Sequence, residues 1–145
     1  MPEKKTIARA KRDKAQGKAP TTQAGEFVRE EMEHIRKGKH GARSAKQAIA
    51  IGLSKARRSG VDLPAPKKGA ASAATRKKAQ RDLEKGHSGK KTKPSAKRSR
   101  ATRTALKREP RSAASKTALS KQAKKAATNR RARGKATPSR GKRSR

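Results

Sequence analysis

Apolar residues recur at helical spacing in only one part of the chain, between residues 24 and 56. The first stripe consists of Ala24, Val28, Met32 and Ile35, at offsets of 4, 4 and 3. Glutamates gather in the first half of this segment and basic residues in its last turn, which suits the helix dipole. We expect a helix that Thr21 or Thr22 caps and that ends at Gly38 in a left-handed conformation.

A second helix has the clearest local signature. Its stripe consists of Ala45, Ile49, Leu53 and Ala56. Ser44 and Gln47 have the spacing of a capping box, in which each side chain bonds the backbone N–H of the other residue. Gly60 suits the residue that ends the helix. The connection at residues 38–41 is short enough to make the two helices antiparallel neighbours.

The two helices together predict a small hairpin, which we call the head. Ala48 and Gly52 would allow its helices to approach closely, and Val61, Leu63 and Pro64 would fold back as a lid. The exposed apolar stripe expected on this head consists of Val28, Met32, Ile35, Ile49 and Leu53. Since two short helices cover such a stripe poorly, it would serve a homodimer contact or a protein partner.

Composition limits how much of the remaining chain we expect to fold. Leu, Ile, Val and Phe together supply only 12 of 145 residues, whereas alanine supplies 27 of the 41 hydrophobic residues. Low hydrophobicity with a net charge of +35 is typical of chains that stay disordered. We therefore expect a mostly disordered protein with a small all-α helical hairpin. The predicted segments are a basic N-terminal arm (1–20), the hairpin head (21–64), a Pro/Gly linker (65–71), a weak helix (72–86) and a disordered basic tail (87–145) that forms nascent helix on binding.

Positive charge concentrates toward the C-terminus. Residues 86–145 hold 22 Lys and Arg but a single acid, Glu109, which gives a net charge of +21. Charge of this density favours a polyanionic partner, and phosphates are bound through counterion release without base reading. The predicted phosphate contacts are Lys90, Lys91, Lys93, Lys97, Arg98, Arg100, Arg103, Lys107, Arg108, Lys124, Lys125, Arg130, Arg131, Arg133, Arg140, Lys142, Arg143 and Arg145.

Several classes of site are not expected. The chain has no cysteine, which removes disulfides and thiolate metal sites, and no apolar run approaches membrane-spanning length. Glu31 and His34 form one Glu-x-x-His pair, but di-metal bundles use two such pairs with further glutamates, so we expect both side chains on a solvated helix face. His40 and His87 lie in Gly-rich turns as polar turn residues. We expect no metal, no cofactor, no small-molecule substrate, no membrane partner and no enzymatic activity, because catalytic groups need a packed support that this composition lacks.

One segment of the head carries a resemblance. The run Ser-Ala-Lys-Gln-Ala-Ile-Ala-Ile-Gly-Leu-Ser-Lys-Ala, residues 44–56, resembles an uncharacterised family of small basic bacterial proteins, and the similarity extends over about residues 26–63. The resemblance implies a bacterial source and transfers no activity. By composition alone, the tail is similar to the lysine-rich tails of linker histones and of bacterial histone-like proteins.

Charge and composition lead to one preferred function and two alternatives. We expect a non-sequence-specific DNA-binding, nucleoid-associated protein of the cytoplasm that acts by phosphate neutralisation. One alternative is an RNA-binding or ribosome-binding basic protein, because phosphate contact does not distinguish the two polymers. The other is a protein-interaction head that a polycationic tail merely localises.

Overall fold

Helices occur in every part of the chain that the structure describes. The computed structural model describes residues 1–90 and 93–136. Within these residues it contains six α-helices and one short 3-10 helix: α1 (Lys4–Ala15), α2 (Pro20–Arg36), α3 (Ala45–Arg58), α4 (Ala73–His87), α5 (Ala96–Arg108), η1 (Arg111–Ala114) and α6 (Lys116–Ala136). The expectation of a mostly disordered chain is therefore wrong. The predicted hairpin is present as α2 and α3, but it forms the centre of a larger helical body.

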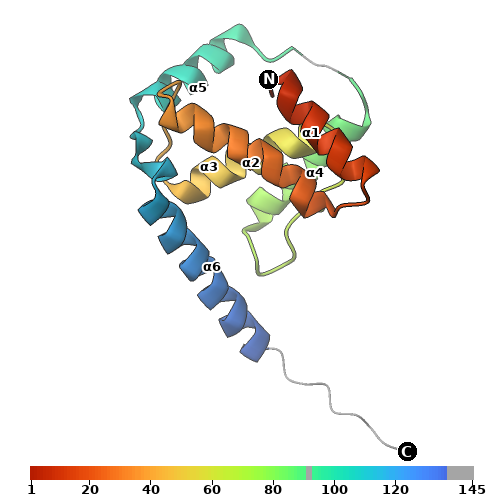
Figure 1. Cartoon of the computed structure of the whole chain (residues 1–145), viewed down its shortest axis with the longest axis vertical. Coiled ribbons are helices and arrows are strands. Elements are labelled where there is room, and N and C mark those ends of the chain that lie inside the picture. The colour runs from red at the N-terminus through yellow and green to blue at the C-terminus, as the bar shows by residue number, and fades with distance from the viewer. Residues whose placement is uncertain (91–92, 137–145) are drawn as a thin grey trace, which may run out of the picture.

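The body is built around the antiparallel pair α2 and α3, with α1 packed on α2 and α4 packed on α3 (Figure 1). Gly52 fixes the distance between the central helices, because a Cβ atom there would lie only 2.7 Å from the Cα of Val28. The prediction that Gly52 permits close approach is confirmed. Gly86 does the same between α3 and α4, where a Cβ would collide with the carbonyl of Arg57. The weak helix predicted over residues 72–86 corresponds to α4, which continues one residue further, to His87.

Two small hydrophobic clusters hold the body together, and alanine supplies much of both. The first comprises Ala10, Ala24, Phe27, Ala56, Val61 and Leu63, and the second Met32, Ile35, Ala42, Ala48, Ala113 and Ala114. Nine of the 14 buried hydrophobic residues are alanines. The disorder prediction failed because it counted large side chains only, whereas alanine-lined helices approach closely enough to bury their shared surface. Val61 and Leu63 belong to the first cluster, as expected for the lid, whereas Pro64 is exposed.

The ends of the helices follow the expected chemistry only in part. The Ser44 hydroxyl accepts a hydrogen bond from the Gln47 amide at 3.2 Å, as predicted. The Gln47 side chain instead accepts from the amide of Arg43 at 2.7 Å, one residue earlier than the capping box requires. Gly38 has the expected positive φ, of 73°. The predicted threonine cap of α2 is wrong, because Ala19 occupies the cap position and Pro20 begins the helix.

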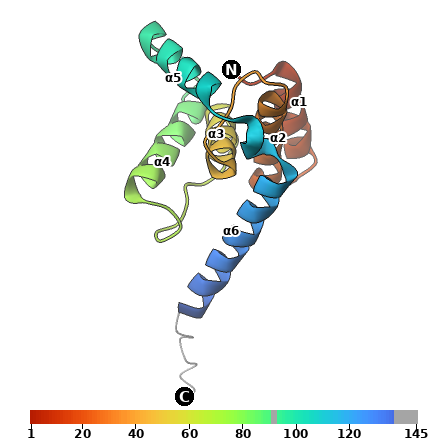
Figure 2. The same cartoon turned by 90° about the vertical axis from the view of Figure 1, so that its left-hand side faces the viewer.

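The two helices beyond residue 95 extend away from this body (Figures 1 and 2). α5 buries none of its residues and packs against no other described helix. α6 touches the body only at its start, through η1 and α3, and then projects outward. No helix of the described residues is both long and apolar enough to span a membrane.

Candidate nucleic-acid interface and a buried histidine cluster

The structure places most of the predicted phosphate contacts on exposed surface. All that it describes are exposed: Lys90, Lys93, Lys97, Arg98, Arg100, Arg103, Lys107, Arg108, Lys124, Lys125, Arg130, Arg131 and Arg133. The remaining five, Lys91, Arg140, Lys142, Arg143 and Arg145, lie outside the described residues. Most of the described side chains lie on α5 and α6. The prediction that they belong to a disordered tail is therefore wrong, because regular helices carry them.

Acidic residues pair with some cations of the body but with none of the described cations of these two helices. Nine of the ten carboxylates lie within 4.0 Å of a Lys, Arg or His nitrogen. Across the described residues, every Lys or Arg in such a pair lies between Arg9 and Arg58. Glu109, the acid nearest to α5 and α6 in the sequence, lies 4.0 Å from Arg43 of the body. The described cations of α5 and α6 therefore face solvent without a carboxylate partner.

Helical spacing arranges some of these cations in a line. Lys97, Arg100, Arg103 and Lys107 follow one another at offsets of 3, 3 and 4, which places them on one side of α5. With 21 residues, α6 is about 30 Å long, since an α-helix rises ~1.5 Å per residue. The two helices thus offer extended rows of charge that a compact loop would not.

The loop between α2 and α3 holds the junction of these helices. The amide of Gly41 donates to the carbonyl of Leu106 at 2.8 Å, and that of Ala42 to Pro110 at 3.1 Å. From α2, the Nε of Arg36 donates to the carbonyl of Ala114 at 3.0 Å. A shallow hollow of about 510 Å³ lies here, lined by Arg36, Arg111, Ala114, Ser115 and Lys116. The body therefore fixes where α5 and α6 begin.

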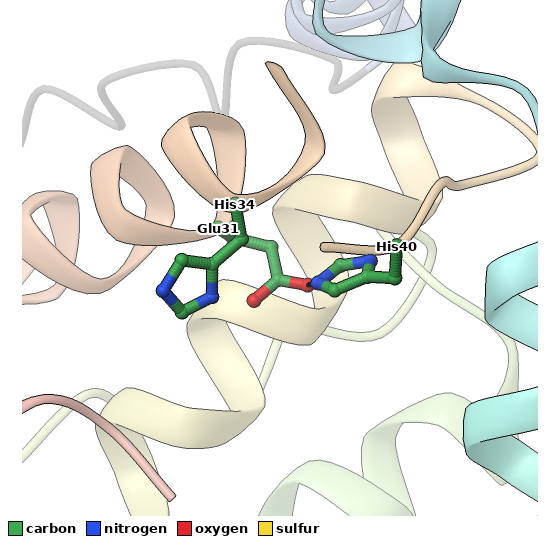
Figure 3. A group of neighbouring side chains, drawn as sticks. All are labelled: Glu31, His34 and His40. Atoms are coloured by element: carbon green, nitrogen blue, oxygen red, sulfur yellow. Dashed lines mark ion pairs between the residues drawn. The ribbon is translucent and has the colours of Figure 1, made fainter. Parts of the chain in front are cut away.

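A separate cluster lies where Glu31 and His34 of α2 meet His40 of the same loop (Figure 3). One potential ligand atom from each residue lies within 4.8 Å of the other two. The Glu31 side chain is 1% exposed, and those of His34 and His40 are 13% and 15% exposed. The two rings lie on either side of the Glu31 carboxylate (Figure 3), with their centroids 6.2 Å apart. The expectation that Glu31 and His34 face solvent is wrong, because α3 and the loop cover this side of α2.

Each group in the cluster is held by a neighbour. Oε2 of Glu31 accepts from Lys55 of α3 at 2.6 Å. Nε2 of His34 contacts Oε1 of Glu3 at 3.0 Å, and Nδ1 of His40 contacts the carbonyl of Gly41 at 2.9 Å. His34 and Lys39 hydrogen-bond the Glu3 carboxylate and lower its pKa to about 2. The side chains are thus oriented from three parts of the chain, which the sequence spacing of Glu31 and His34 alone does not reveal.

The predicted apolar stripe of the head is covered within the chain. Met32 and Ile35 are buried in the second cluster, with Val28 and Ile49 packed against it, and Leu53 packs on the first cluster. Much of the cover comes from Ala113 and Ala114 of η1, which the sequence had placed in the tail. Among the described residues, Met1 is the only large hydrophobic residue that is exposed.

Comparison with known proteins bears on the head alone. A model of a family of unknown function (DUF6496) matches residues 16–68. This match agrees with the resemblance to an uncharacterised family, and it includes α2, α3 and the three residues of the buried cluster. Residues 69–145, with α4, α5 and α6, lie outside it. No curated protein and no solved structure matches the chain.

Proposed function

We propose that the protein binds nucleic acid, with duplex DNA as the preferred polymer, through the exposed lysines and arginines of α5 and α6. The observation that supports this is the segregation of charge: the acids pair with cations of the body and leave these helices unneutralised. A polyanion would relieve the mutual repulsion of their side chains, and released counterions would supply the free energy of binding.

Contact with the phosphate backbone is the mode that the side chains favour. Proteins that bind single strands or read RNA sequence stack bases on aromatic rings. Phe27 is the only Phe, Trp or Tyr of the chain, and it is 1% exposed within the first hydrophobic cluster. An α-helix of ~10–12 Å diameter fits the major groove of B-DNA, about 12 Å wide, whereas the major groove of A-form RNA is deep and narrow. These dimensions favour DNA over RNA as the partner of α6.

The test is the dependence of duplex binding on salt, measured by fluorescence anisotropy with an unrelated pair of DNA sequences. Engagement of about 8–10 phosphates gives a log–log slope of about −7 to −9, with equal affinity for the two sequences. A slope shallower than about −3 would contradict the proposal. Competition with structured RNA at a fixed salt concentration tests the polymer, and a clear preference for RNA would support the RNA-binding alternative instead.

A matched pair of triple variants tests the role of α5. The combined change Arg100→Ala, Arg103→Ala and Lys107→Ala removes one row of charge from a helix that buries no residue. We expect the salt slope to fall by up to about 2.7, since each phosphate contact contributes ~0.9. The control changes Lys46, Lys67 and Lys68, which are also exposed and lie outside α5 and α6, and removes the same charge. Equal slopes for the two variants would show that net charge acts without any role for α5.

The expectation that the chain is not an enzyme stays a prediction. Its premise was that this composition supplies no packed support, and the two hydrophobic clusters show that the premise is wrong. Association with the nucleoid and a head that recruits proteins likewise stay predictions.

A further inference from the structure

The buried cluster of Glu31, His34 and His40 has no part in the proposed binding of nucleic acid. It combines a carboxylate with two imidazoles, the ligand types that bind first-row transition metals, in a chain without cysteine. Three features of its geometry decide what it can bind: the tautomers of the histidines, the state of the Glu31 oxygens and the local charge.

The neighbours of the two histidines determine which nitrogen of each ring is free. The carbonyl of Gly41 can only accept a hydrogen bond, so Nδ1 of His40 is the donor at 2.9 Å. An ionised Glu3 likewise only accepts, so Nε2 of His34 is the donor at 3.0 Å. In the neutral rings, the lone pairs then reside on Nε2 of His40 and Nδ1 of His34, the latter on the side of the ring toward Glu31 (Figure 3). Second hydrogen bonds of this kind orient histidines that bind metals.

The Glu31 carboxylate has one oxygen held and one left over. Lys55 donates to Oε2 at 2.6 Å, but Oε1 is buried without a hydrogen-bond partner. Nε2 of His40 lies 3.1 Å from this oxygen without hydrogen-bond geometry. A neutral His40 would thus bring its lone pair against those of a carboxylate, which is unfavourable for a buried group. A cation between the two atoms converts that repulsion into coordination.

Local charge and spacing also fit a cation. Glu3, Glu30 and Glu31 gather around the two histidines, and Lys39 and Lys55 are the cations paired with them, so one negative charge remains. The ligand atoms of tetrahedral Zn²⁺ lie about 3.3 Å apart, as follows from metal–ligand distances of ~2.0–2.1 Å. The pair at 3.1 Å already has this spacing. One ligand atom of each residue lies within 4.8 Å of a ligand atom of the other two, so side-chain movements of roughly 1.5 Å in sum would bring three ligand atoms to the spacing of a tetrahedral site.

We propose that Oε1 of Glu31, Nδ1 of His34 and Nε2 of His40 bind a divalent transition-metal ion, with Zn²⁺ as the preferred ion. Imidazole ligands select Zn²⁺ over Mg²⁺ and Ca²⁺, and three protein ligands leave the fourth position of a tetrahedral ion for a water molecule or another group. The ion would tie α2 to the following loop, and through Glu3 to the segment before α1.

The experiment uses the untagged full-length protein after treatment with a chelator, titrated with Zn²⁺ or Mg²⁺ and followed by calorimetry and thermal unfolding. We expect one Zn²⁺ per chain and, at about 100 times Kd, a rise in Tm of about 5 to 10 °C. Mg²⁺ should produce neither effect. The absence of stoichiometric Zn²⁺ binding would overturn the proposal.

Single variants assign the ligands, and His87 provides the control. His34→Gln and His40→Gln should each weaken Zn²⁺ binding by more than about 100-fold. Glu3→Ala removes the carboxylate that accepts from His34 and Lys39, and it should weaken binding by about 10- to 100-fold. His87 is the third histidine of the chain and pairs with Asp62 instead, so His87→Gln should bind Zn²⁺ as the parent does. Equal affinity for the His34, His40 and His87 variants would overturn the assignment.

Two further measurements keep these outcomes interpretable. Circular dichroism of each variant without metal establishes that its helices form, and Glu3 is exposed enough that its variant tests the site without opening the core. The salt slope of DNA binding is measured with chelator present. Since the cluster lies within the body and the proposed DNA contacts lie on α5 and α6, failure of either proposal leaves the other measurement unchanged.

Discussion

Two glycines in neighbouring helices provide a direct test of the packed body. Gly52 of α3 faces α2, where an added Cβ would lie 2.7 Å from the Cα, 2.9 Å from the Cγ2 and 3.0 Å from the amide nitrogen of Val28. Gly25 of α2 is exposed, and a Cβ there would meet nothing within 4 Å. The same substitution to alanine should therefore have opposite effects at the two positions.

The expected magnitudes follow from these distances. Alanine is better than glycine in a helix by about 0.8–1.0 kcal/mol, so Gly25→Ala should stabilise the protein by nearly 1 kcal/mol. Gly52→Ala has the same intrinsic gain, but overpacking costs about 1–3 kcal/mol. Two of the three nearest atoms belong to the Val28 backbone, which cannot rotate away, so the upper end of that range applies. The net result is a loss of about 2 kcal/mol.

Urea unfolding followed by circular dichroism at 222 nm measures both effects. The parent should unfold cooperatively, with Gly25→Ala shifted to higher urea and Gly52→Ala to lower urea at an unchanged m-value. A disordered chain would show no transition, and in it both substitutions would simply raise helicity. A Gly52 variant as stable as the Gly25 variant would refute the close packing of α2 against α3.

Three further changes test particular contacts. Ser44→Ala removes the side-chain cap of α3 and should cost about 1 kcal/mol in urea unfolding. Asp82→Ala removes a buried carboxylate 2.7 Å from the half-exposed Arg58 and should cost about 2 kcal/mol. Arg58→Ala should cost at least as much, because it leaves the buried carboxylate of Asp82 without its cation. The hydrogen bond from His87 lowers the pKa of Asp62 below its ordinary value. The ionised Asp62 therefore stabilises the fold fully above the pKa of the unfolded state, and this stabilisation is lost as the pH falls through the lower pKa of the folded state. Between pH 5 and 2, the Tm of the Asp62→Asn variant should fall less than the Tm of the parent protein.

The sequence predicted the centre of the fold because strong local signals lie there. Periodic apolar residues identified α2 and α3, and Ser44 identified the start of α3. α1 and η1 have few large apolar residues, so their packing through Ala10, Ala113 and Ala114 gave no periodic signal. The sequence alone does not distinguish a fully buried alanine at a helix contact from an alanine on a solvated helix face. Tertiary contacts alone distinguish them.

The buried cluster shows a similar limit. The sequence shows the spacing of Glu31 and His34 but does not show which way their side chains face, because α2 has apolar residues on one side and glutamates on most others. His40 lies beyond the end of α2, in a loop whose path depends on Gly38 and on its contacts with Leu106 and Pro110. Periodicity within a helix carries no information about a ligand from a loop.

The distribution of acids connects the fold to the proposed function. Ten carboxylates cannot neutralise 45 lysines and arginines, so their positions decide which part of the chain is stable without a polyanion. Buried or half-buried pairs such as Glu31 with Lys55 and Asp82 with Arg58 join α2, α3 and α4. These pairs stabilise contacts between helices, whereas carboxylates on α5 or α6 would weaken contact with phosphates. The same segregation therefore makes the body compact and leaves the two projecting helices to bind an anion.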